Sequence, residues 1–154
     1  MSAKPAAHDI FVLIRDVVSD INSIVRSGQS ITYNKGSFEL MIDKQLLRNV
    51  MFNLLSNAIK FSPEGAEIDV HVDDEGEEVV VAVKDQGIGI SEADMKNLYG
   101  RFFRGENAIA IPGTGLGLNI VTKYLELMQG RITCTSALNE GTTFYIHLPK
   151  TKSN

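Results

Sequence analysis

Three polar residues share one face of a long predicted helix. The segment 44–61 carries apolar residues at helical spacing, and Asn53, Asn57 and Lys60 fall together on the face opposite this stripe. Two amide oxygens can hold a hard cation, and the ammonium can meet a phosphate. Asparagine and lysine are also ordinary on a solvated helix face. Asparagine is a poor helix former, however, and its repetition in mid-helix costs roughly a few tenths of a kcal/mol each time unless it is used.

A carboxylate stands at the end of an apolar strand, in the segment Asp85-Gln86-Gly87-Ile88-Gly89-Ile90. A buried carboxylate is costly unless it is hydrogen-bonded, and it could accept from an exocyclic amine such as that of adenine. The glycines would let a ligand approach the backbone closely. A plain turn built on the same aspartate and glycine is an equally good interpretation of this motif alone.

Three glycines within five residues open a further predicted helix, in Gly113-Thr114-Gly115-Leu116-Gly117-Leu118. Backbone N–H groups at a helix start form an anion site. The motif is not a Walker P-loop, because no lysine follows the glycines, and it is not a dinucleotide fingerprint, because no strand immediately precedes it. Each glycine costs roughly 1 kcal/mol against alanine, which favours a functional interpretation.

A fourth segment joins aromatic residues to two arginines, in Tyr99-Gly100-Arg101-Phe102-Phe103-Arg104-Gly105. Taken alone, it is better interpreted as a short helix end that packs its aromatic side chains and leaves its arginines in water.

The whole chain sets limits on the class of protein. Its 154 residues suit one domain, and 15 lysines and arginines against 19 aspartates and glutamates give a net charge of −4. This balance excludes a protein that coats nucleic acid. One cysteine excludes an internal disulfide and an all-cysteine metal site. No apolar run is long enough to cross a bilayer, and we expect no secretory leader.

The periodicity predicts the elements that must hold these motifs. We expect a loose segment over 1–9, an ordered domain over 10–150 and a short tail over 151–154. Apolar residues at helical spacing predict helices over 10–26, 44–61, 91–103 and 116–129. Alternating or continuous apolar runs predict strands over 30–33, 37–42, 66–73, 77–85, 131–136 and 142–148. This pattern indicates an α/β two-layer sandwich, in which a mixed β-sheet packs against helices.

The order of the four motifs resembles a known family. It is similar to the catalytic ATP-binding domain of bacterial-type sensor histidine kinases, within the superfamily shared with gyrase, Hsp90 and MutL. The motifs of 53–61, 85–90, 99–105 and 113–118 resemble that family's N box, G1 box, F box and G2 box. The resemblance runs from about Phe11 to Pro149 and implies a Bergerat-type ATP-binding fold.

The resemblance implies which residues handle Mg²⁺ and the phosphates. Asn57 would coordinate a Mg²⁺ ion that bridges the triphosphate, and Asn53 would support it from one turn earlier. Lys60 would contact phosphate, and Arg104 would reach the γ-phosphate during transfer. The lid hinge and the phosphate-binding N–H groups would come from Gly113, Thr114, Gly115, Leu116, Gly117 and Leu118.

A second group of residues is implied for the adenosine part of ATP. Asp85 would bind the adenine amine, and Phe61 would lie near the nucleoside. The adenine pocket would be shaped by Gly87, Gly89 and Ile90. Thr142 or Thr143 would touch the adenine site.

Position 53 separates two activities within the superfamily. Hydrolytic members resembling gyrase have a glutamate there as general base for water, whereas this chain has Asn53, and an amide is no useful base at neutral pH. A neutral imidazole already offers a lone pair, so Asn53 favours transfer to histidine over ATP hydrolysis. A nucleotide-binding interaction module without transfer is the third alternative; intact Asn57, Lys60 and Asp85 count against it.

No histidine of this chain fits the acceptor. His8 is followed by Asp9 but not by the rest of the family's acceptor motif, and we interpret His71 and His147 as structural. We therefore expect an isolated catalytic domain, monomeric and cytoplasmic, either free or as the cytoplasmic part of a membrane-bound receptor. ATP would be its substrate and ADP its product. Its partners would be a separate helical dimerisation and phosphoacceptor domain and, indirectly, a response regulator, but no nucleic acid.

Overall fold

The strands that the structure describes form one mixed sheet and one small strand pair. A computed structural model describes residues 3–87 and 118–150, with the backbone alone for Leu118 and Asn119. Its strands are β1 (Ala6–Asp9), β2 (Ser30–Tyr33), β3 (Glu39–Ile42), β4 (Glu67–Asp74), β5 (Glu78–Lys84), β6 (Arg131–Ala137) and β7 (Gly141–Pro149). Its helices are α1 (Ile10–Ile21), the 3₁₀ turn η1 (Asn22–Ile24), α2 (Lys44–Phe61) and α4 (Leu118–Leu127).

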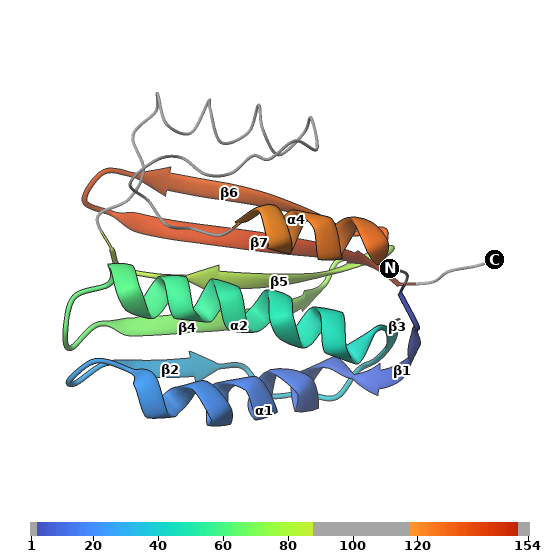
Figure 1. Cartoon of the computed structure of the whole chain (residues 1–154), viewed down its shortest axis with the longest axis horizontal. Helices are drawn as coiled ribbons and strands as arrows, with labels where there is room; N and C mark the ends of the chain where they lie inside the picture. The colour runs from blue at the N-terminus through green and yellow to red at the C-terminus, as the bar shows by residue number, and fades with distance from the viewer. Residues whose placement is uncertain (1–2, 88–117, 151–154) are drawn as a thin grey trace.

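The main sheet has the strand order β2-β4-β5-β7-β6. Strand β2 runs parallel to β4, and every other neighbouring pair in this sheet is antiparallel. The helices α1, α2 and α4 lie side by side over one face of the sheet (Figure 1). The predicted two-layer α/β sandwich with a mixed sheet is therefore confirmed.

Helix α2 has the bounds that the sequence predicts. Asp43 caps its first turn, since its carboxylate accepts a hydrogen bond of 3.1 Å from the Leu46 N–H. The helix ends before Pro63, which cannot continue it. Its inward stripe is fully or almost fully buried and comprises Leu47, Val50, Met51, Leu54 and Ala58. The stripe fixes the rotation of α2, so the opposite face, with Asn53 and Lys60, is turned away from the core.

The core lies between the helices and the inward face of the sheet. Alternate residues of the strands point into it, and they comprise Ile68, Val70, Val72, Val79, Val81, Val83, Ile132, Cys134, Phe144 and Ile146. Burying one valine, leucine or isoleucine contributes about 1.5–3 kcal/mol, so this layer dominates the stability of the sandwich. In the described part of the chain, no helix is both long enough and apolar enough to span a bilayer.

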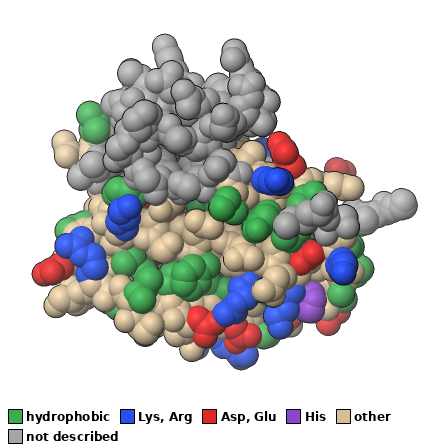
Figure 2. Space-filling view, viewed as in Figure 1, with side chains coloured by type: hydrophobic (Ala, Val, Ile, Leu, Met, Phe, Trp, Pro, Cys, Tyr) green, Lys and Arg blue, Asp and Glu red, His purple; other side chains and the backbone are tan. Residues whose placement is uncertain are grey.

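The outward face of the helical layer is not uniformly polar. Each of the three helices exposes a large apolar side chain: Val12 on α1, Phe52 on α2 and Ile120 on α4. Figure 2 shows apolar side chains near the middle of this face and charged ones toward its edges.

The N-terminal segment differs from the expectation. The sequence predicts a loose segment over 1–9, but Ala6–Asp9 forms β1, which pairs antiparallel with β3. Asp9 ties this strand to its surroundings, because its carboxylate accepts from the Phe11 N–H at 2.9 Å and from the Ser37 hydroxyl at 2.8 Å. Strand β1 has only four residues and little apolar pattern, so its order depends on backbone pairing with β3 and on the hydrogen bonds of Asp9.

Two predicted helices are shorter in the structure. The helix expected over 10–26 ends at Ile21 and continues as η1, because Val25 is extended and the Arg26 N–H is bound by the side chain of Gln29. The helix expected over 116–129 is described as Leu118–Leu127, and Gln129 follows in a left-handed conformation. The helix expected over 91–103 lies outside the described residues.

Candidate nucleotide site

Asp85 stands where β5 ends, beside the first residues of β7. Its backbone N–H donates to the Thr142 carbonyl at 2.9 Å. Its Oδ1 accepts from the N–H of Thr142 at 3.0 Å and from that of Gly87 at 2.9 Å. The residue is 8% exposed. These three bonds fix the carboxyl group at one edge of the sandwich.

Burial raises the pKa of the Asp85 carboxyl group above its ordinary range. The N–H groups of Gly87 and Thr142 act in the opposite direction, but the loss of hydration is the larger effect. Burial also raises the pKa of the nearby Cys134 thiol to about 12, and the negative charge of Asp85 adds to this shift. The carboxylate therefore lies in surroundings where water competes poorly, so a hydrogen bond to a ligand amine counts for more.

Two glycines let other segments approach Asp85 and its loop. A β-carbon on Gly87 would lie 2.6 Å from the carbonyl oxygen of Phe61, so the loop rests directly on the end of α2. Gly141 has a φ of +87°, and a β-carbon there would lie 2.2 Å from the carbonyl oxygen of Asp85. These close contacts are sufficient to explain why glycine occupies both positions. The further role of Gly87 in shaping an adenine pocket stays a prediction.

The end of α2 comes to the same edge of the molecule as Asp85, because Gly87 rests on the Phe61 carbonyl. Asn57 is buried, at 8% exposed, whereas Asn53 is half-buried and Lys60 is exposed. The Asn53 amide nitrogen donates to the Asn49 carbonyl at 3.4 Å, which leaves its oxygen as the atom suited to a cation. The Lys60 ammonium lies 5.3 Å from the centre of the Phe61 ring.

Of the two threonines predicted near the adenine, only Thr142 reaches Asp85. Thr142 is buried, and its hydroxyl lies 2.8 Å from that of Ser136. Thr143 follows on the opposite face of the sheet, in register with Lys84 on one side and Thr135 on the other.

Several predicted site residues lie outside the described part of the chain. They are Gly89, Ile90, Arg104, Gly113, Thr114, Gly115, Leu116 and Gly117. Leu118 begins α4, but its side chain is not described. The roles that the resemblance implies for all of these stay predictions.

Ser62, which no sequence motif singles out, joins the end of α2 to the segment after β5. Its hydroxyl accepts from the Gln86 N–H at 3.2 Å, and the residue is wholly buried. A serine directly before Pro63 at the end of a predicted helix was the available signal, but such a residue reads as an ordinary cap. Nothing in the local pattern indicates that its partner lies in the segment after β5.

The histidines interpreted as structural have partners in the sheet. His147 lies 2.9 Å from the Thr133 hydroxyl and 3.2 Å from a carboxylate oxygen of Glu78. His71 lies 3.1 Å from Asp73. His8, expected in a loose segment, is part of β1.

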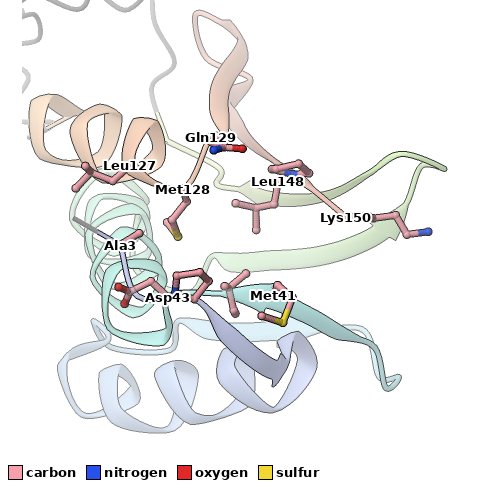
Figure 3. A pocket seen from close by; sticks show the side chains of 11 residues that line it. Ala3, Met41, Asp43, Leu127, Met128, Gln129, Leu148 and Lys150 are labelled. Atoms are coloured by element: carbon pink, nitrogen blue, oxygen red, sulfur yellow. The ribbon is translucent and has the colours of Figure 1, made fainter. Parts of the chain in front are cut away.

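A separate pocket of about 340 Å³ lies at the other end of the sandwich. It is bordered by Asp43 at the start of α2, by the end of α4 and by the end of β7, and Met41, Met128 and Leu148 contribute apolar walls (Figure 3). Asp85 lies by the start of β7 and Lys60 at the end of α2, so this pocket is not part of the site described above.

Comparison with known proteins points to one family. The family described as "Histidine kinase-, DNA gyrase B-, and HSP90-like ATPase" matches residues 42–152. Over 112 residues the chain is 38% identical to the sensor histidine kinase WalK of Bacillus subtilis, covering 70% of this chain and 18% of WalK. Over 148 residues it is 34% identical to the sensor-like histidine kinase SenX3 of Mycolicibacterium smegmatis, covering 94% of this chain and 38% of SenX3.

Solved structures share the fold over nearly the whole chain. The catalytic domain of the histidine kinase ThkA superposes with a TM-score of 0.80 at 25% identity, covering 97% of this chain and 99% of that domain. The mycobacterial sensor histidine kinase MprB gives a TM-score of 0.78 at 24% identity, covering 97% of this chain and all of that one. The resemblance found in the sequence is thus confirmed, and the chain belongs to the histidine kinase-, DNA gyrase B- and HSP90-like ATPase family, with sensor histidine kinases as its relatives.

Proposed function

We propose that this chain is the ATP-binding catalytic domain of a sensor histidine kinase, which transfers the γ-phosphoryl group of ATP to a histidine on a separate helical domain. The observation that carries this proposal is Asp85, a buried carboxylate fixed by the N–H groups of Gly87 and Thr142. Both of these hydrogen bonds end on Oδ1, so Oδ2 is the oxygen that can accept from the adenine amine.

The end of α2 supplies the residues for the phosphates. Lys60 would meet the phosphates with its exposed ammonium, and Phe61 would border the nucleoside. Because Gly87 rests on the Phe61 carbonyl, these residues and Asp85 belong to one continuous surface. A nucleotide bound with its adenine on Asp85 would then extend its phosphates along α2.

The amide groups of Asn53 and Asn57 fit a magnesium ion that arrives with the nucleotide. Amide oxygens are hard ligands, and Mg²⁺ usually keeps several waters and completes its shell with substrate phosphates. The described residues contain no cluster of three acidic or histidine side chains that could hold a metal alone. When bound, Mg²⁺ would neutralise charge on the phosphates; Asn57 would bind it and Asn53 would hold the neighbouring position.

Transfer rather than hydrolysis is the activity that Asn53 supports. An amide cannot remove a proton from water at neutral pH, whereas a neutral histidine needs no such base to attack phosphorus. Phosphoryl transfer then depends on positioning and on charge stabilisation by Lys60 and Arg104. The γ-phosphorus gains a bond to the acceptor nitrogen, and ADP leaves with the electrons of the broken bond.

The acceptor histidine and the helical domain that carries it would belong to another part of a longer kinase or to another chain. The relatives WalK and SenX3 are far longer than the matched region. A solved structure shows ThkA in complex with the response regulator TrrA. The apolar side chains that α1, α2 and α4 expose are a suitable surface for a helical partner. We also propose a cytoplasmic location and a monomeric isolated domain.

The proposal is tested by calorimetric titration with ADP and with a non-hydrolysable ATP analogue, each with and without Mg²⁺. We expect binding that Mg²⁺ strengthens and that Asp85→Asn abolishes. The solved structure of ShkA in complex with AMPPNP, whose fold matches with a TM-score of 0.74, makes AMPPNP a suitable analogue. Absence of binding under all four conditions would overturn the proposal and leave only the fold.

A further inference from the structure

One hydrogen bond joins the segment after α2 to the segment after β5. The Ser62 hydroxyl accepts from the backbone N–H of Gln86 at 3.2 Å, and Ser62 is 0% exposed. Lys60 comes two residues before Ser62, and Asp85 comes directly before Gln86. The bond therefore lies between the segment that carries Lys60, proposed for the phosphates, and the segment that carries Asp85, proposed for the adenine.

The backbone carbonyl of Ser62 is bound by two side chains from the segment just before β2. Its carbonyl accepts from the Gln29 amide nitrogen at 3.1 Å and from the Arg26 guanidinium at 2.9 Å. The same Gln29 nitrogen also donates to the carbonyls of Ile59 and Pro63, at 3.1 and 3.2 Å. The last carbonyls of a helix have no partners within the helix, and Gln29 binds one of them, that of Ile59, together with the carbonyls of the two residues that follow Phe61. The end of α2 is thereby fixed before the hydroxyl of Ser62 reaches the next segment.

Next to this hydrogen bond, the backbones of the two segments are in close contact. A β-carbon on Gly87 would lie 2.6 Å from the Phe61 carbonyl, so the two backbones are already in contact there. The Ser62 hydroxyl adds a directional bond one residue away on each segment. A close contact prevents the segments from approaching further, whereas the hydrogen bond prevents them from separating.

We propose that Ser62 is a positioning residue, which sets the spacing between the phosphate-binding end and the adenine-binding end of the site. This inference rests on the proposed nucleotide-binding function. A ligand that spans both ends feels a change in this spacing, whereas a ligand that engages only the adenine end does not. The inference thus predicts a difference between ligands, which a general loss of stability would not produce.

The clean comparison is Ser62→Thr against Ser62→Val. Both variants add the same methyl group to a wholly buried position, so any steric cost is shared, and only threonine keeps the hydroxyl. Mg·ADP affinity is measured by calorimetry and the affinity for free adenine by NMR titration. We expect Ser62→Val to bind Mg·ADP about fivefold or more weakly than Ser62→Thr, and the two to bind adenine within about twofold.

A second pair of variants keeps the test decisive if the added methyl group prevents folding. Ser62→Ala removes the hydroxyl without adding volume, and Ser37→Ala is a control that removes an exposed hydroxyl. The Ser37 hydroxyl also joins two segments, by donating to Asp9 at 2.8 Å, but at the opposite end of α2. We expect only Ser62→Ala to weaken Mg·ADP binding, with the affinity for free adenine retained.

Two results would overturn the inference. Equal Mg·ADP affinities for the threonine and valine variants would show that the hydroxyl is not needed. Parallel losses for Mg·ADP and free adenine would show that Ser62 merely supports the adenine end. A wild-type chain that fails to bind Mg·ADP would instead overturn the proposed function, and the wild-type titration alone identifies that case.

Discussion

Gly141 lies directly against the backbone carbonyl of Asp85. A β-carbon at position 141 would be 2.2 Å from that oxygen, and the φ of Gly141 is +87°. The turn that begins β7 is thus shaped around the proposed adenine contact. The carbonyl of the next residue, Thr142, accepts from the backbone N–H of Asp85, and the Thr142 N–H donates to the Asp85 carboxylate. Any side chain at position 141 must move Asp85 or the start of β7.

Gly141→Ala should therefore lower both the stability of the fold and the affinity for nucleotide. The positive φ alone costs about 1 kcal/mol, and the contact with the Asp85 carbonyl adds to it, for a total on the order of 3 kcal/mol. Denaturant unfolding measures the first effect and calorimetry with Mg·ADP the second.

Gly76→Ala is the control for this substitution. Gly76 has a φ of +90°, but nothing lies within 4 Å of a β-carbon placed there. Gly76→Ala therefore incurs the cost of a positive φ but no steric clash. Gly76 lies in the hairpin between β4 and β5, away from the site. If the two variants lose equal stability and bind nucleotide equally, the contact between Gly141 and Asp85 does not matter.

Asp85→Asn should abolish nucleotide binding and yet not destabilise the folded chain at neutral pH. Because burial raises the pKa of this carboxyl group, its ionised form costs stability in the folded state. Asparagine keeps an oxygen for the N–H groups of Gly87 and Thr142 and removes the buried charge. We expect the unfolding midpoint at pH 7 to rise by about 2–4 °C, equivalent to roughly 1 kcal/mol.

The pH dependence of that difference has a definite sign. A carboxyl group whose pKa is raised on folding binds its proton more tightly in the folded state, so stability falls as the pH rises from its ordinary value of 3.8 through the raised one. The advantage of Asp85→Asn over the wild type should accordingly shrink below pH 4 and reach its full size above the raised pKa. A constant difference between pH 3 and pH 8 would contradict the assignment to Asp85.

The elements that the sequence predicts well are those with a strong local pattern. Helix α2 has a long apolar stripe, a capping Asp43 and a terminating Pro63, so its bounds follow from neighbouring residues. Strands β4 and β5 follow from their alternating and continuous valines. The family was indicated by the order of the four motifs at 53–61, 85–90, 99–105 and 113–118 rather than by these elements alone.

What the sequence could not predict depends on contacts between distant segments. Strand β1 is held by pairing with β3 about 30 residues away, and its exposed residues carry no apolar period. The bond between Ser62 and Gln86 spans 24 residues and uses a hydroxyl that any helix end could carry. The choice of Thr142 over Thr143 follows from the register of β7, which a local pattern does not fix.

Cys134 offers a chemical probe of the packing around Asp85. It is the one cysteine of the chain, it is 1% exposed, and burial raises the pKa of its thiol to about 12. The thiolate is the reactive form, so the native protein should react with a disulfide reagent at pH 8 only through transient opening. Unfolding in guanidinium should release one reactive thiol per chain, and saturating Mg·ADP should slow the native reaction about tenfold or more. Rapid, stoichiometric modification of the native chain would contradict the buried thiol.

Lys60 should act mainly on the ligand, because its side chain is exposed and, among the residues that the structure describes, its ammonium lies over the Phe61 ring. We expect Lys60→Ala to weaken Mg·ADP binding about tenfold, to leave adenosine binding unchanged and to shift stability by less than about 0.5 kcal/mol. Lys44→Ala is the matched control, since Lys44 is an exposed lysine at the opposite end of the same helix. The loss at Lys60 should also diminish as salt is raised, because screening weakens an exposed charge interaction. Equal losses for Mg·ADP and adenosine would place Lys60 outside the phosphate end and would break the proposed direction of the nucleotide along α2.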